Sequence, residues 1–304
     1  MACILITGGT GLVGKALTAF LTGKGHEVII LTRDITGKTA GNGASFAKWD
    51  VKKQELDIAA LQKADHIIHL AGAGVMEKKW TEAYKKEIVS SRADSARLLV
   101  NSLQQNSNKV RSVISASAIG WYQPTGTVHT EEEPADTSFL GETCRLWEES
   151  VEPVTALGKR LVKFRIGIVL SKHGGALKEF MTPLKLGVAA ILGNGKQMIS
   201  WIHITDLCRL FLFAIENEKT GGAYNAAAPA PVNNKTLTLT LAKKMKRFYI
   251  PVHVPSFILK IMLGGRSIEI LKSTDASCKK IMDAGFAFEF NTIDAAVEDL
   301  VKRN

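Results

Sequence analysis

Three glycines near the start of the chain constrain its fold more than any other feature. Gly8, Gly11 and Gly14 lie in the string TGGTGLVG, which directly follows the apolar run Cys3–Thr7 and leads into the amphipathic stretch Leu12–Leu21. A strand, a glycine-rich turn and a helix in this order form the dinucleotide-binding fingerprint of parallel α/β folds. The first glycine allows a tight turn, the second lets the backbone approach a pyrophosphate, and the third allows close packing of helix on strand.

Further short apolar runs alternate with amphipathic stretches through the first half of the chain. Strands that are apolar throughout, each followed by a helix, are typical of a parallel sheet covered on both faces. The predicted strands are Glu27–Thr32, Asp65–Leu70, Val110–Ser115 and Leu161–Ile166, and helices are expected from about Trp80 to Leu103 and over Phe139–Leu157. The sequence therefore predicts an α/β fold, a Rossmann-type doubly wound parallel sheet with a smaller mixed C-terminal substrate lobe.

The second half changes character, because glycine and proline punctuate it and the helical stretches become short after Pro229. A strand-like run, Gln197–Ile204, leads into a helix that begins near Thr205. We expect residues 1–170 to form the cofactor-binding Rossmann domain, completed by about 201–228. Residues 171–200 and 229–304 are expected to form the smaller, substrate-binding lobe over the carboxyl ends of the strands.

The end of the second predicted strand selects the cofactor. Proteins of this kind that use NAD carry an acidic residue ~20 positions after the glycines, where it binds ribose. Here the strand ends in Thr32 at the expected acidic position, followed by Arg33. A guanidinium there can pair with a 2′-phosphate, whereas Asp34 could neutralise Arg33 or bind ribose itself. We predict NADP(H), with NAD(H) as the alternative, so residues 1–170 are read as an NADP-binding domain.

Composition argues against several other classes of protein. The four cysteines are scattered without a pairing motif, which predicts reduced thiols and no metal site. The net charge of +10 is spread along the chain and forms no dense basic run, so we expect no nucleic-acid partner. No apolar run approaches the ~20 residues that cross a bilayer, and no leader precedes the glycine motif. We therefore expect no membrane partner and a cytoplasmic location.

Several strings along the chain together resemble the extended short-chain dehydrogenase/reductases, which include nucleotide-sugar epimerases. They are TGGTGLVG, Trp49-Asp50, Leu70-Ala71-Gly72, Ser115-Ala116-Ser117, Thr130-Glu131, Phe164-Arg165-Ile166-Gly167 and Trp201–Leu207. The resemblance implies that Asp50 contacts adenine and that Leu70–Gly72 runs beside the nicotinamide ribose. The cofactor-binding residues predicted from the motifs and the resemblance are Gly8, Thr10, Gly11, Leu12, Val13, Gly14, Thr32, Arg33, Asp50, Leu70, Ala71, Gly72, Arg92, Ser115, Arg165 and Gly167.

Within that superfamily the chain is most similar to epimerase-like proteins of the YfcH type. The shared strings include SASAIGWY, FLGETCRLWE, FRIGIVLS, YNAAAP and AGFAFEF. The superfamily's chemistry uses Tyr-x-x-x-Lys, in which the lysine lowers the pKa of the tyrosine that moves a proton. Here Leu140 stands at the tyrosine position and Cys144 at the lysine position, a replacement that the YfcH type shares.

Other side chains could carry the proton instead. Ser117, with Ser115 as the alternative register, is the first candidate to face nicotinamide or substrate, and Tyr122 could supply a phenol. A serine that satisfies backbone groups and a packing aromatic are the structural alternatives. Cys144 could be a redox-active thiol or a small buried residue, and Glu142 an acid or base or a solvated carboxylate.

Residues for the substrate follow from the same resemblance. Gln197, Trp201 and His203 are predicted to wall the substrate site, with a hydrogen-bonded structural role as the alternative for His203. Arg92 follows two serines on the long predicted helix. It could bind an anion of the cofactor or the substrate, or it could form an ion pair between helices.

Two functions remain open from the sequence. The first is an NADP(H)-binding oxidoreductase or epimerase-like enzyme that transfers hydride to or from an unknown small molecule. The second is a non-catalytic protein that senses NADP(H) and signals through a partner surface, because the Tyr/Lys pair is replaced while the binding residues are kept. A homodimer paired through helices would be usual for such relatives.

Overall fold

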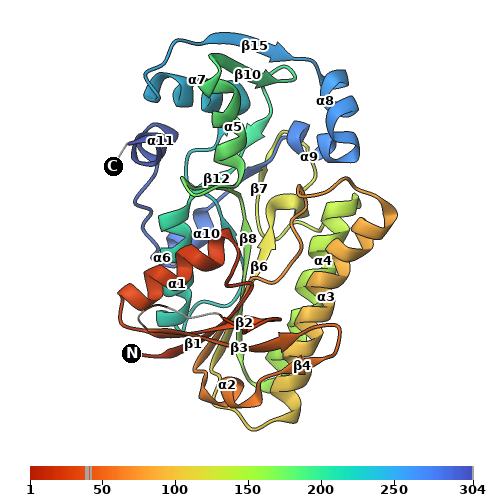
Figure 1. Ribbon diagram of the computed structural model, residues 1–304, viewed down its shortest axis with the longest axis vertical. Helices are drawn as coiled ribbons and strands as arrows, with labels where there is room; N and C mark the ends of the chain where they lie inside the picture. The colour runs from red at the N-terminus through yellow and green to blue at the C-terminus, as the bar shows by residue number, and fades with distance from the viewer. Residues whose placement is uncertain (38–40, 42, 303–304) are drawn as a thin grey trace.

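A large sheet lies below a smaller lobe in the computed structural model, which describes residues 1–37, 41 and 43–302 (Figure 1). Eight strands of the described chain form the sheet in the order β13-β8-β6-β5-β1-β2-β3-β4. Neighbouring strands run parallel except β3 and β4. The strands are β1 (Cys3–Thr7), β2 (Glu27–Thr32), β3 (Ala44–Asp50), β4 (Glu55–Leu56), β5 (His66–His69), β6 (Ser112–Ala118), β8 (Arg160–Ile166) and β13 (Gly222–Ala226). The predicted fold class is confirmed.

The direction in which strands are added reverses at β1. This strand pairs with β2 on one side and with β5 on the other, so that Thr7 lies opposite both Leu31 and His69. The chain builds β2 and β3 first and then returns past β1 to build β5, β6, β8 and β13. Ligands of open α/β sheets bind at such a switch point, outside the carboxyl ends of the strands.

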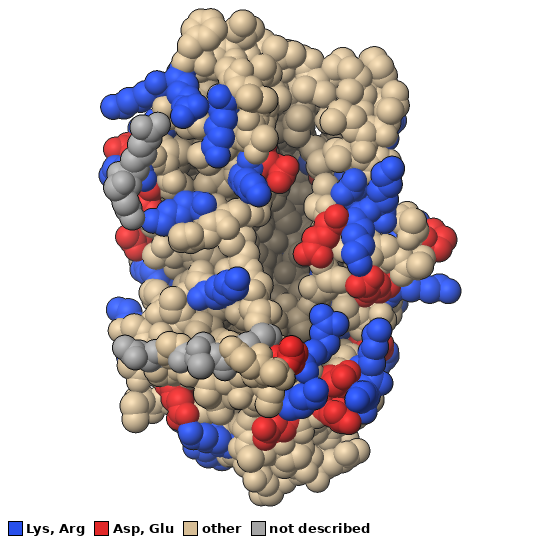
Figure 2. All heavy atoms as spheres, viewed as in Figure 1, with Lys and Arg blue, Asp and Glu red and all other residues tan. Residues whose placement is uncertain are grey.

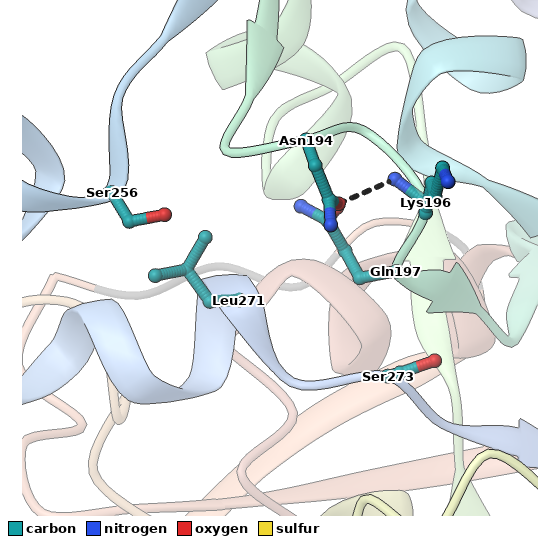
Figure 3. A pocket seen from close by; sticks show the side chains of 6 residues that line it. All are labelled: Asn194, Lys196, Gln197, Ser256, Leu271 and Ser273. Carbon is teal, nitrogen blue, oxygen red and sulfur yellow. Dashed lines mark hydrogen bonds between the residues drawn. The ribbon is translucent and has the colours of Figure 1, made fainter.

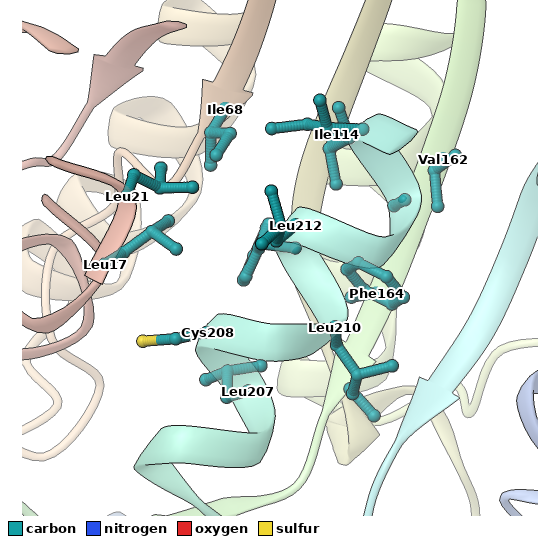
Figure 4. Packing of buried hydrophobic residues seen from close by; sticks show 14 of the residues in the cluster. Leu17, Leu21, Ile68, Ile114, Val162, Phe164, Leu207, Cys208, Leu210 and Leu212 are labelled. Carbon is teal, nitrogen blue, oxygen red and sulfur yellow. The ribbon is translucent and has the colours of Figure 1, made fainter. Parts of the chain in front are cut away.

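Helices cover both faces of the sheet, as buried apolar strands require. One face packs against α1 (Leu12–Gly23), α6 (Ile204–Glu216) and α10 (Lys279–Asp283), and the other against α2 (Ile58–Lys63), α3 (Glu82–Gln105) and α4 (Phe139–Val151). Figure 4 shows the first face, where Leu17 and Leu21 of α1 meet α6 at Cys208. This packing fixes the start of α1, and with it the glycine loop, against the sheet.

The smaller lobe gathers segments that are far apart in the sequence. Its helices are α5 (Ala176–Lys185), α7 (Asn234–Lys244), α8 (Ser256–Leu263), α9 (Ser267–Leu271) and α11 (Ile293–Val301). Its paired strands are β10 (Val188–Leu192) with β15 (Ile250–Val254), and β11 (Met198–Ile199) with β14 (Val232–Asn233). Leu184, Trp201, Leu237 and Val297 contribute to its own core. The lobe therefore has a hydrophobic core separate from those of the sheet.

The smaller lobe touches the loops that follow the sheet strands. A Cβ added to Gly175 would lie 2.9 Å from Leu12 Cδ2 in the glycine loop. Arg266 Nη1 donates to the Met76 carbonyl, in the loop after β5, at 2.8 Å. Two short pairs also join the parts, β7 (Val128–His129) with β16 (Asp275–Ala276), and β9 (Ile168–Leu170) with β12 (Trp201–His203). The lobe thus lies over the carboxyl ends of the strands, while Ile281 and Phe286, which were predicted for the lobe, pack in the core of the sheet.

Two predicted elements are divided in the structure. The helix expected over Phe139–Leu157 ends at Val151 and continues as a 3-10 turn, because Pro153 has no N–H to extend the α-helical pattern. The strand expected over Gln197–Ile204 breaks at Ser200, where the chain changes partner from β14 to β9. Ser200 Oγ satisfies the backbone on both sides by donating to the Thr274 carbonyl and accepting from the Ala276 N–H.

Some strands have no clear pattern in the sequence. The strands β13 and β15 were not predicted, and β3 was expected only through its end, Trp49-Asp50; β3 is half exposed and carries a lysine, so its pattern is weak. The four cysteines are all buried and free, as predicted. Within the described ranges, no helix is both long enough and apolar enough to span a bilayer.

Candidate active site

The glycines of the first loop differ in the space around them. Other protein atoms lie close to Gly8, Gly9 and Gly14, whereas Gly11 has room for a side chain. A Cβ on Gly14 would lie 2.4 Å from the Gly8 carbonyl oxygen, and one on Gly9 would lie 2.7 Å from Ile30 Cγ2. Gly8 has a φ of +69°, and a Cβ there would lie 2.8 Å from the Leu70 carbonyl. Gly11 differs, because its φ is −76° and, among the described residues, its Cβ would meet only the Gly8 oxygen, at 3.4 Å. The protein therefore has no steric need for glycine at this exposed position.

The helix that begins at this loop has no side-chain cap. Gly11 is the N-cap of α1, no described side chain caps its first turn by a hydrogen bond, and that turn holds no acidic residue. By contrast, Asp57, Thr81 and Asn233 cap α2, α3 and α7. The open N–H groups and the positive end of the helix dipole can bind an anion. The loop thus has both the space and the donors for a pyrophosphate.

A buried polar chain fixes the switch point below the loop. Thr7 Oγ1 accepts from the N–H groups of Leu70 and Ala71 at 3.0 and 3.1 Å, so its hydrogen points to His69 Nδ1 at 2.9 Å. His69 Nε2 then faces Ser95 Oγ at 3.4 Å. Burial lowers the pKa of His69 to about 4, which keeps the ring neutral. Thr7, His69 and Ser95 were not predicted as site residues. The histidines at both ends of the buried run HIIH do indicate polar contacts inside the sheet.

We expect His69 to contribute to a loss of stability in acid. Its folded pKa of about 4 lies below the ordinary 6.5, so its stabilising effect is complete above pH 6.5 and is lost as the pH falls through about 4. The linked free energy is about 3 kcal/mol. Urea unfolding at several pH values should show a smaller slope in His69→Gln, while the rest of the slope persists because burial also lowers the pKa of His66, to about 4, and of His203. The exposed His253→Gln control should keep the wild-type slope, and an unchanged slope in His69→Gln would contradict the assignment.

The residues predicted to select the cofactor lie at the end of β2. Arg33 is exposed, and its carbonyl oxygen accepts from Lys48 Nζ at 2.8 Å, which brings a second cation to this edge. Asp34 Oδ1 accepts from the Thr36 N–H at 2.9 Å, in a local turn. Asp50 Oδ1 likewise accepts from the N–H groups that follow β3. The edge beyond the glycine loop therefore carries two cations, Arg33 and Lys48, beside two carboxylates that accept from backbone N–H groups.

Arg92 binds the loop after β5. Its Nη1 donates to the carbonyls of Ala73 and Ile88 at 3.0 and 2.9 Å, while Ser91 Oγ accepts from the Ala73 N–H. The guanidinium carbon lies 4.9 Å from the ring centre of Trp147 in α4. The contact between helices is therefore a cation–π contact, and within the described chain no carboxylate forms an ion pair with Arg92. The predicted residues Leu70, Ala71 and Gly72 lie at the beginning of this held loop.

The two predicted catalytic hydroxyls lie in one buried network. Ser117 Oγ donates to Glu148 Oε1 at 2.8 Å, and Arg165 Nε donates to the same oxygen at 2.9 Å. Arg165 Nη1 donates to Tyr122 Oη, which donates to Asn225 Oδ1 at 2.7 Å. Ser117 is 2% exposed and Tyr122 is fully buried. Burial raises the pKa of Tyr122 to about 12, so this phenol holds its proton at neutral pH.

Two further predicted cofactor residues have structural partners of their own. A Cβ on Gly167 would lie 2.6 Å from the Ser200 carbonyl oxygen, so packing alone requires glycine there. Ser115 is 1% exposed and donates to the Ala116 carbonyl oxygen. The cofactor assignment of both residues stays a prediction.

The positions of the missing tyrosine and lysine lie beside the loop after β6. Cβ of Leu140 and Sγ of Cys144 would lie 3.4 and 3.5 Å from a Cβ on Gly120. Burial raises the pKa of the Cys144 thiol to about 12, so it is not a thiolate at neutral pH. Glu142 lies on the surface of α4 in an ion pair with Arg145. None of these three groups is suited to exchange a proton with substrate near neutral pH.

The predicted substrate residues separate in the structure. Gln197 lines a cavity of about 390 Å³ together with Asn194, Lys196, Ser256, Leu271 and Ser273 (Figure 3). Trp201 is fully buried and donates from Nε1 to the Ala230 carbonyl. His203 caps α6 by accepting from the Thr205 N–H and stacks on Phe290. Trp201 and His203 are therefore not among the residues that line this cavity.

Lys and Arg side chains lie on both sides of a hollow along the middle of the face in Figure 2. An open parallel sheet, an uncapped glycine loop at its switch point and a lobe over the strand ends define a Rossmann-type protein that binds a nucleotide cofactor. Residues 4–227 match the model of the NAD dependent epimerase/dehydratase family, and residues 254–300 match a domain of unknown function, DUF1731. The chain belongs to this NAD-dependent epimerase/dehydratase family, a part of the extended short-chain dehydrogenase/reductases.

Similar proteins span the whole chain. It is 34% identical to the epimerase family protein SH2119 of Staphylococcus haemolyticus, with 99% of each chain covered. It is also 34% identical to the epimerase family protein YfhF of Bacillus subtilis, with 98% of this chain and 97% of the relative covered. The crystal structure of human epimerase family protein SDR39U1 (isoform 2) with NADPH matches with a TM-score of 0.87 at 27% identity, covering 98% of this chain and 99% of the human one.

Proposed function

We propose that the protein binds NADP(H) and acts as an oxidoreductase or epimerase-like enzyme on a small-molecule carbonyl or alcohol. The observation that carries the proposal is the open glycine cradle, in which Gly11 and the uncapped start of α1 leave room and donors for a pyrophosphate. The exposed Arg33 and the nearby Lys48 supply cations for a 2′-phosphate. The crystal structure of the similar human protein is one with NADPH, which supports a preference for NADP(H) over NAD(H).

The chain's own residues would position the cofactor and enclose the substrate. A bound nicotinamide supplies or accepts hydride, and the protein contributes orientation and exclusion of water. Arg92 and Ser91 fix the loop after β5, against which the cofactor would lie. Ser117 and Tyr122 would act as positioning residues, because they hold Glu148 and Arg165 below the loop after β6. The cavity at Gln197 would receive the substrate.

The first experiment is to identify what the protein binds. Mass spectrometry and absorbance of gently purified protein would reveal a copurifying dinucleotide, and titrations with NADPH, NADP⁺, NADH and NAD⁺ would give the affinities. We expect NADPH and NADP⁺ to bind most tightly. Failure of all four dinucleotides to bind would overturn the proposal, because the glycine cradle would then have another ligand or none.

Arg33→Ala should weaken NADPH binding by about 10- to 100-fold, because a hydrogen bond between charged groups contributes about 1.5–3 kcal/mol. NADH binding should not change, since NADH has no 2′-phosphate. Fluorescence titration of both cofactors measures the difference. The exposed Arg247→Ala, in the smaller lobe, is the matched control and should bind like wild type. Equal losses for NADH and NADPH would remove Arg33 as the selecting residue.

A further inference from the structure

One segment of the smaller lobe reaches the place where the superfamily's tyrosine and lysine would act. This segment, 264–272, includes α9 and lies above the ends of α3 and α4 in Figure 1. A Cβ on Gly265 would lie 3.3 Å from Trp80 Cε3, after β5. Lys272 Nζ donates to the Gly120 carbonyl at 3.2 Å, after β6. The segment is therefore anchored at both loops beside the switch point.

Glu269 is the carboxyl group that this segment brings to the site. Its charge acts on the Cys144 thiol, whose pKa it helps to raise, so Glu269 lies within electrostatic reach of the vacated lysine position. Leu271, two residues further along, lines the cavity that also includes Gln197. Glu269 thus lies on the segment that runs from Trp80 to the cavity at Leu271 and to the loop after β6 at Lys272, and its charge reaches Cys144 in α4.

Glu269 differs from the other charged groups around it. Lys272 pairs with Asp136 at 3.4 Å, and Asp136 also accepts from Ser138. In the part of the chain that the structure describes, no hydrogen bond or ion pair engages the Glu269 carboxyl. Burial and the nearby charge of Asp136 raise the pKa of Glu269, while Lys272 partly opposes this. The pKa of Asp136 is instead lowered by its hydrogen bonds.

We propose that Glu269 is the catalytic residue that exchanges a proton with the substrate oxygen, in place of the missing tyrosine. The proposal rests on the proposed function. In the direction of reduction, the carbonyl carbon receives hydride from the reduced nicotinamide, and the carbonyl oxygen takes the proton of the Glu269 carboxylic acid. The products are the alcohol, the oxidised nicotinamide and the Glu269 carboxylate, which regains a proton from water. Oxidation of an alcohol follows the reverse path.

The test measures proton release when NADP⁺ binds, and therefore needs no substrate. A positively charged nicotinamide ring close to Glu269 favours its carboxylate, so binding should release a proton wherever the carboxyl is partly protonated. Calorimetry in two buffers of different ionisation enthalpy, between about pH 5 and pH 7.5, counts the protons. We expect wild type to release protons, Glu269→Gln to release at most half as many, and Glu269→Asp to retain part of the release.

Matched controls separate the possible outcomes. Glu216→Gln, an exposed carboxyl at the end of α6, should release protons like wild type. The proposed function fails if wild type binds no NADP⁺. The assignment of Glu269 alone fails if NADP⁺ binds but wild type and Glu269→Gln release the same number of protons, or none. Once a substrate is found, Glu269→Gln should lower kcat by about 10²- to 10⁴-fold with unchanged NADPH affinity.

Discussion

Gly11→Ala should lower NADPH affinity by at least about 100-fold, or about 3 kcal/mol, without unfolding the protein. Within the part of the chain that the structure describes, the added methyl group would meet only the Gly8 carbonyl oxygen, 3.4 Å away, and the backbone φ of −76° suits alanine. The same methyl group would occupy the space that a pyrophosphate needs above the start of α1. Fluorescence titration measures the affinity, and thermal unfolding without cofactor measures the stability.

Gly14→Ala is the contrasting variant within the same loop. Alanine normally favours a helix over glycine, but here its Cβ would lie 2.4 Å from the Gly8 carbonyl oxygen and 2.5 Å from Gly9 Cα. We expect a loss of at least about 3 kcal/mol in the free energy of unfolding and a Tm lower by at least about 5 °C. The interpretation of the loop would be wrong if Gly11→Ala bound NADPH like wild type, or if it lost as much stability as Gly14→Ala.

Removal of the Glu148 carboxylate should cause the largest loss of stability among side-chain changes near the site. Glu148 and Arg165 are 5% and 4% exposed, and they face each other at 2.9 Å. Glu148→Ala leaves a guanidinium buried without its counterion, and breaking one partner of such a pair costs about 3–5 kcal/mol. Ser117 would lose its acceptor at the same time. Urea unfolding of the purified variant gives the change directly.

A double-mutant cycle makes this prediction specific to the pair. Adding Arg165→Met to Glu148→Ala removes the orphaned charge, so the double variant should be more stable than Glu148→Ala alone. Asp283→Ala, which breaks the exposed Lys279–Asp283 pair, should leave stability nearly unchanged, because exposed ion pairs contribute little. If Glu148→Ala were as mild as Asp283→Ala, the network would not be the stabilising element that its geometry implies.

The main sheet was predictable because its signals are local. The strand at Cys3–Thr7, the glycine turn and the helix from Leu12 follow one another without interruption, and burial on both faces makes the central strands apolar throughout. The weak elements were those whose partners are distant in the sequence. β13 lies at the sheet edge beside β8, and β15 pairs with β10 some 60 residues earlier, so neither has a strong pattern of its own.

The candidate site was predictable only where its residues follow a predicted strand, because the other contacts join segments that are distant in the sequence. The loop glycines and Arg33 can be identified from position, because each follows a strand that the pattern reveals. The roles of Ser117, Tyr122 and Arg165 could not be derived that way, since their partners come from α4 and from β13. Whether a side chain at the end of a strand points to a helix or to the open site depends on tertiary packing, which a single sequence does not reveal.

The sequence by itself determined the fold class, the cofactor loop and the absence of the Tyr-x-x-x-Lys pair, because each follows from local patterns: apolar runs that alternate with amphipathic stretches, the spacing of three glycines, and the residues at two positions of one helix. Only the tertiary structure decided which loop glycine is free for a ligand and which hydroxyls are buried in the Glu148–Arg165 network. It also placed Glu269, more than a hundred residues after Cys144, within electrostatic reach of that thiol. Steric space, burial and electrostatic proximity are properties of atoms that meet only when distant segments pack together.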